Sequence, residues 1–77
     1  MLLNEMITDE NNIGYIPSLG LSFQTNKIGT EIINYIKNGL TKDEIVEKIS
    51  EQYKIRYEDS FIDVSDFFSK LKIYGLI

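Results

Sequence analysis

Residues 21–36 read LSFQTNKIGTEIINYI, and the hydrophobic period of the chain changes in the middle of this stretch, at Asn26. Residues 21–25 alternate between apolar or β-branched and polar side chains, which predicts a β-strand. From Ile28 to Ile36 the apolar residues follow helical spacing. Asn26 is a favoured helix N-cap, because its side chain accepts from the free amides of the first turn. The stretch therefore predicts strands before residue 26 and helices after it.

The segment before Asn26 is expected to form a three-stranded meander. The predicted strands are Leu2–Ile7, Ile13–Ile16 and Leu21–Thr25. Polar residues 9–12 form the first expected turn, and residues 17–20, which include proline and glycine, form the second.

Three helices are expected after it. The first ends at Asn38-Gly39, because glycine adopts the left-handed position that follows a helix. The second starts at Thr41, which with Glu44 forms a capping box. The third starts between residues 57 and 60 and ends at Gly75, with residues 76–77 folding back on it.

Two alternative start positions are compatible with the sequence of the third helix. Ser60 with Asp63 offers a second capping box, and Glu58 with Asp59 offers first-turn acids. In both cases the fold class is α+β, with a three-stranded antiparallel sheet followed by a winged-helix-turn-helix-like bundle of three helices.

Composition limits the possible functions. The chain has 77 residues, a net charge of -4 and neither cysteine nor histidine. One small domain over residues 1–77 is expected, without thiol chemistry and without the commonest general base and metal ligand. We predict no enzyme, no catalytic residue, no metal and no cofactor. Cytoplasmic location is expected, since no apolar run reaches the roughly 20 residues that span a bilayer and no signal peptide is present. The initiating methionine and the ending at Ile77 favour a discrete protein.

The charges are unevenly placed. Residues 1–26 contain no lysine or arginine, and no basic stripe suited to phosphates appears anywhere. The start of the third helix, which enters the major groove in trihelical DNA binders, carries acids. We therefore expect no nucleic-acid partner and no membrane partner. The predicted strand 21–25 has no charge at all, although exposed strand edges are usually protected by lysine or proline.

Several short motifs carry a resemblance to the PqqD family. Asn26-Lys-Ile-Gly29-Thr-Glu-Ile32 resembles the step that opens the family's first helix. Asn38-Gly-Leu-Thr-Lys-Asp-Glu-Ile45 resembles its following turn. Tyr53, Asp63-Val64, Phe67-Phe68, Leu71 and the ending Gly75-Leu76-Ile77 resemble its last helix. The resemblance covers residues 13–77, with departures at Gln24-Thr25 and Ser60, where the family often has apolar residues.

The resemblance implies a RiPP recognition element. Such a domain is a non-catalytic peptide chaperone that binds the leader segment of a ribosomally made precursor peptide. It delivers the precursor to a modifying enzyme, often a radical SAM protein. The leader adds as a strand to the third strand and lies against the third helix, which would explain the uncharged edge.

Predicted peptide contacts come from two elements. On the third strand Leu21 and Phe23 are expected to face the helices, with Phe23 at the groove floor. One helix stripe, Val64, Phe67, Leu71 and Tyr74, is expected to pack in the core, and a neighbouring one, Phe61, Ser65, Phe68 and Lys72, to face the peptide. The predicted contact set is Leu21, Ser22, Phe23, Gln24, Thr25, Phe61, Val64, Ser65, Phe68 and Lys72.

Two alternatives stay open. One is a small winged-helix DNA-binding or regulatory domain. The other is an obligate oligomer in which the uncharged edge pairs with its own copy. The favoured state is a monomer or weak dimer.

Overall fold

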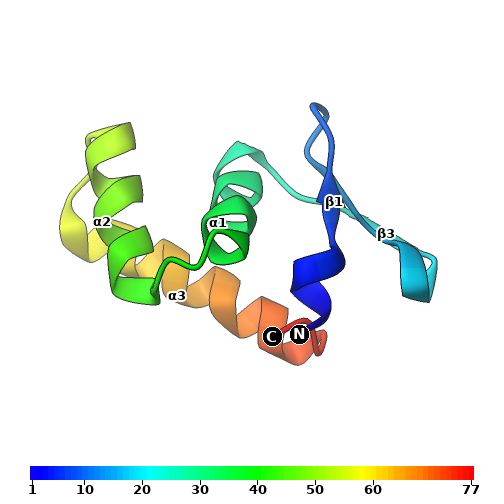
Figure 1. The fold of residues 1–77 in the computed structure, drawn as a ribbon. Coiled ribbons are helices and arrows are strands. Elements are labelled where there is room, and N and C mark those ends of the chain that lie inside the picture. Colours follow the sequence, from blue (N-terminus) through cyan, green and yellow to red (C-terminus); the bar gives the residue numbers. More distant parts are fainter.

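The computed structural model describes residues 1–77 as a sheet beside three helices (Figure 1). The sheet consists of β1 (Ile7–Thr8), β2 (Ile13–Ile16) and β3 (Leu21–Gln24) in the antiparallel order β1-β2-β3. The helices are α1 (Lys27–Lys37), α2 (Lys42–Tyr53) and α3 (Tyr57–Ile73). In Figure 1, α3 runs below α1 and α2 toward the sheet, and the two termini lie together at its end. The predicted α+β fold of three strands followed by three helices is confirmed.

The predicted first strand is wrong over most of its length. Leu2–Glu5 forms a 3-10 helix, η1, and only Ile7–Thr8 pairs with β2. The reason is the spacing of the two apolar anchors: Leu3 and Met6 are both fully buried. Residues three apart lie on opposite faces of a strand but on the same side of a 3-10 turn. The turn therefore buries both side chains together.

The turn after β2 is also helical. Pro17–Leu19 forms a short 3-10 helix, η2, and Gly20 follows it in the left-handed conformation at φ 63°. Proline suits the first position of such a turn because it has no N–H to leave unpaired. The turn reverses the chain and brings β3 alongside β2.

The predicted caps of α1 and α2 are confirmed. The Asn26 side chain accepts from the Gly29 amide at 2.8 Å. Thr41 and Glu44 form the capping box, with each side chain accepting from the other residue's backbone amide. These bonds satisfy amides that have no partner within the helix.

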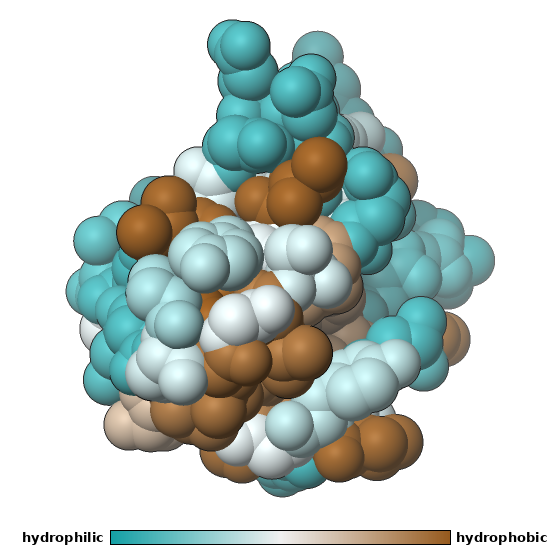
Figure 2. All heavy atoms as spheres, turned by 90° about the vertical axis from the view of Figure 1, so that its right-hand side faces the viewer, coloured by the Kyte–Doolittle hydropathy of each residue, from teal (hydrophilic) through white to brown (hydrophobic).

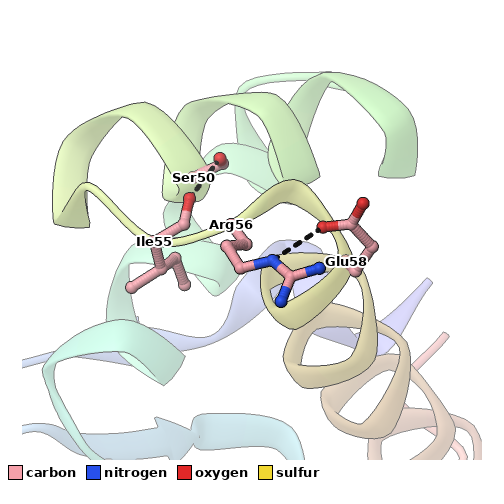
Figure 3. Close-up of polar contacts among 4 residues, drawn as sticks. All are labelled: Ser50, Ile55, Arg56 and Glu58. Carbon is pink, nitrogen blue, oxygen red and sulfur yellow. Dashed lines mark hydrogen bonds and ion pairs between the residues drawn. The ribbon is translucent and has the colours of Figure 1, made fainter.

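The turn between α2 and α3 is drawn in Figure 3. Ser50 Oγ donates to the carbonyl of Ile55 at 2.7 Å, and Arg56 Nε lies 3.4 Å from a Glu58 oxygen. α3 begins at Tyr57 with Glu58 and Asp59 in its first turn. The capping-box alternative for Ser60 is wrong, because Ser60 is fully buried within the helix and donates to the carbonyl of Val46 at 2.7 Å.

The core is built from η1, β2, the three helices and the C-terminal segment. It contains twelve buried apolar side chains: Leu3, Met6, Ile16, Ile32, Ile33, Ile36, Ile45, Val46, Ile49, Val64, Leu71 and Leu76. The C-terminal segment folds back as predicted, since Leu76 is buried and its carbonyl accepts from the Leu3 amide at 3.0 Å. This bond ties η1 to the end of α3. It places the C-terminal half of α3 next to the sheet.

Candidate functional site

The outer edge of β3 has no neighbouring strand. β3 pairs with β2 on one side, and β2 separates it from β1. The Thr25 amide donates to the Asn12 carbonyl at 2.8 Å, which continues the ladder beyond the strand. Because hydrogen-bonded pairs alternate along an antiparallel ladder, Leu21 and Phe23 turn their main-chain groups toward β2. The main-chain N–H and C=O groups of Ser22 and Gln24 therefore point to the open edge.

The side chains of β3 alternate between the two faces of the sheet. Leu21 and Phe23 lie opposite Ile16 and Gly14 in the register, so they share the face on which Ile16 is buried against the helices. Phe23 covers Gly14, where a Cβ atom would come within 3.0 Å of Phe23 Cζ. Leu21 is 55% exposed. The predicted orientation of both residues toward the helix side is confirmed.

A groove lies between β3 and the C-terminal half of α3. Its volume is about 640 Å³, within the usual range for ligand sites. Figure 2 shows the side of the molecule that carries the sheet, where apolar side chains gather in the centre and lower half and hydrophilic ones lie above them. The groove is lined from the sheet side by Ile16 and residues 21–26, and from the other side by Phe67, Lys70, Leu71, Tyr74 and Leu76.

Local features of α1 hold the helix side of this groove in place. Gly29, the third residue of α1, is buried. A Cβ atom at this position would collide with Thr25 Oγ1 and lie 2.9 Å from Phe67 Cε1. Glycine therefore lets α1 approach the Phe67 ring closely. The Asn26 cap fixes the direction in which the chain leaves β3.

A smaller extension continues the groove past Asn26. It has a volume of about 260 Å³ and shares Asn26, Phe67 and Lys70 with the main groove. Asp63 and Asp66 of α3 form its acidic side. Lys70 Nζ lies 3.1 Å from Asp66 Oδ2, whereas Asp63 takes part in neither ion pair of the chain. The groove is thus apolar at one end and acidic at the other.

The predicted contact residues divide into two groups. Leu21, Ser22, Phe23, Gln24 and Thr25 all line the groove. The helix residues of the prediction do not: they are Phe61, Val64, Ser65, Phe68 and Lys72.

These helix residues lie elsewhere on α3. Val64 is fully buried in the core, and Phe68 is half-buried against it. Phe61 is 43% exposed with Lys42 Nζ 4.8 Å from its ring centroid. Ser65 Oγ is buried without a hydrogen-bond partner. A peptide in this groove would not touch them, so their predicted peptide contacts would need a second surface.

The helix side of the groove uses the other stripe of α3. Phe67, Leu71 and Tyr74 line the groove together with Lys70. Leu71 is buried in the core and Phe67 packs against it, as expected, whereas Tyr74 is not part of the core. Tyr74 is 74% exposed. Helical periodicity identifies both stripes, but it contains no signal that says which one faces β3.

The groove lining is mainly apolar, with Lys70 as its one charged side chain. No cluster of three or more potential metal ligands occurs in the chain. The two groups with shifted pKa values both lie outside the groove lining. Glu44 has its pKa lowered by hydrogen bonds from the Thr41 backbone and side chain, and burial raises the pKa of Tyr53 to about 12. None of the helices is long and apolar enough to cross a membrane.

Comparison with known proteins gives a family match and a structural match. The family model described as "Coenzyme PQQ synthesis protein D (PqqD)" matches residues 13–77. Among solved structures, the chain is similar to "Lasso peptide synthetase B1 complexed with the leader peptide" with a TM-score of 0.75. The two are 16% identical, and the match covers 92% of this chain and 87% of that one. No curated protein sequence matches. The structural likeness supports the same fold.

Proposed function

The chain belongs to the PqqD family, and from this premise we propose that it is a non-catalytic peptide chaperone. It binds the leader segment of a ribosomally made precursor peptide and delivers the precursor to a modifying enzyme. The observation that carries the proposal is the open edge of β3 beside an apolar groove. A peptide strand can add its main-chain hydrogen bonds at such an edge while its side chains enter the groove.

We expect the peptide to pair with two residues of β3. Ser22 and Gln24 present main-chain donors and acceptors to the open edge, and the next peptide strand would pair with them. Leu21, Phe67, Leu71 and Tyr74 supply the apolar contacts. The similarity in fold to a lasso peptide synthetase solved with its leader peptide supports the proposal.

The proposal of a partner enzyme rests on the resemblance to the PqqD family. A domain of 77 residues without histidine or cysteine has few groups suited to chemistry on a peptide. We therefore assign the reaction to a separate modifying enzyme, such as a radical SAM protein. This chain would recognise the leader.

A proline at the open edge tests strand addition. The probe is the leader of any short precursor peptide that is found encoded beside the gene for this chain, titrated into isotope-labelled protein and followed by NMR. We expect saturable shifts at the Ser22 and Gln24 amides. Ser22→Pro removes an outward-facing donor while the ladder to β2 stays intact, and it should weaken binding about tenfold or more.

The matched control is Thr8→Pro. Thr8 lies on β1, and the Asp9 amide donates to the Ile13 carbonyl at 3.1 Å, so the alternation directs the Thr8 amide to the far edge of the sheet. This variant should bind normally. Phe23→Pro is a poor test, because the Phe23 amide faces β2. Unchanged binding by a folded Ser22→Pro variant would contradict strand addition.

A further inference from the structure

The two ends of the groove differ in charge. The turn that joins β1 to β2 lies at the Thr25 end, since Asn12 accepts from the Thr25 amide and Gln24 Nε2 donates to the Asn11 carbonyl. Asp9 and Glu10 belong to this turn. In the extension of the groove, Asp63 and Asp66 of α3 face the single ammonium group of Lys70.

Lys70, the basic residue that lines the groove, already forms an ion pair. Lys70 Nζ lies 3.1 Å from an Asp66 oxygen, which leaves Asp63 without an ion-pair partner in the extension of the groove. The opposite end, between Leu21 and Tyr74, is apolar and exposed. Complementary charges select partners and orient them on docking.

The strand register adds a spacing rule. A peptide added to β3 would turn every second side chain toward the face that carries Leu21, Phe23 and Thr25. These positions lie over the apolar part of the groove. A peptide that continues past Thr25 reaches the extension beside Asp63.

We propose that this groove selects a leader segment with apolar residues at alternate positions and a lysine or arginine at the end that lies past Thr25. The proposal rests on the proposed function and specifies its peptide class. The apolar residues enter the groove between Leu21 and Tyr74. The basic residue pairs with Asp63, which fixes the peptide's direction on the edge.

Synthetic peptides of about ten residues, alternating leucine and threonine, serve as probes. Each carries two lysines or two glutamates at one end, and both ends are tested because either strand direction can pair. Binding is measured at low salt from the NMR shifts of the Ser22 and Gln24 amides. For one of the two directions, we expect the lysine peptide to bind at least about fivefold more tightly than its glutamate counterpart.

Two variants separate the attraction of the peptide to Asp63 from its attraction to the net negative charge of the whole chain. Asp63→Asn should reduce this preference to about twofold or less. Glu47→Gln removes the same charge from an exposed position on α2 and should leave the preference unchanged. A preference that survives in Asp63→Asn would overturn the assignment to Asp63.

Two further outcomes distinguish failure of the charge preference from failure of strand addition. Equal affinity for lysine and glutamate peptides, with shifts at Ser22 and Gln24, would overturn the charge rule and support strand addition. Absence of these shifts with every peptide would count against strand addition itself.

Discussion

At the scale of single residues, Gly29 couples α1 to the groove. Its α-hydrogen occupies the place where a Cβ atom would collide with Thr25 Oγ1 and crowd the Phe67 ring. Gly29→Ala should destabilise the fold by about 1 kcal/mol, because overpacking outweighs the better helix propensity of alanine. Urea unfolding measures the loss, and the Phe67 ring resonances should move with it. Asn34→Ala, an exposed change on the same helix, should lose no stability. Equal unfolding free energies for both variants would show that the Phe67 ring can move aside without loss of stability.

Tyr53 gives the unfolding free energy a dependence on pH. Its hydroxyl donates to Glu31 Oε2 at 2.8 Å, and burial together with this carboxylate raises its pKa to about 12. The unfolded chain loses the same proton near pH 10. The stabilisation is therefore fully present below about pH 10 and is lost as the pH rises toward 12. In Tyr53→Phe the decline between these values should be shallower, which urea titrations at pH 9 and 11 can measure. Tyr57→Phe, at an exposed site, should retain the full decline.

Among the elements, α3 has two apolar stripes, of which only the one with Phe67, Leu71 and Tyr74 lines the groove. Tyr74 lines the groove and is largely exposed, so Tyr74→Asp should fold. We expect this variant to bind the leader at least about tenfold more weakly, since aromatic anchors dominate binding energy. Phe61→Asp, on the face outside the groove, should bind within about twofold of the parent. Calorimetry with the same leader compares them. The reverse result would move the peptide to the face formed by Phe61, Ser65, Phe68 and Lys72.

The structure shows which features of the chain can be predicted from its sequence. Caps such as Asn26 and Thr41 are local, so the sequence predicts them correctly. The β3 half of the groove is also predictable, because strand alternation places Leu21 and Phe23 on one face. The α3 half of the groove is not predictable from the sequence. Both stripes of α3 are apolar, and the angle at which α3 crosses the sheet decides which stripe faces β3. The 3-10 turn at Leu2–Glu5 is missed for a related reason: a short apolar run does not distinguish a strand from a tight helix.

In the whole molecule, β3 is an edge strand, so a peptide and a second copy of the chain would compete for the same open edge. The edge is only four residues long, and each copy carries a net charge of -4, so self-pairing brings like charges together. We therefore expect a monomer at low micromolar concentration and a weak dimer near millimolar concentration. Sedimentation velocity at both concentrations tests this expectation.

The dimer should depend on the same main-chain groups as the peptide complex. Ser22→Pro should abolish it, Thr8→Pro should not, and a saturating amount of leader should dissociate it. Added salt should strengthen it, because screening weakens the repulsion between the two acidic copies. A dimer that persists at low micromolar concentration and resists the leader would instead assign the β3 edge to an obligate oligomer. Peptide recognition would then have to use another surface.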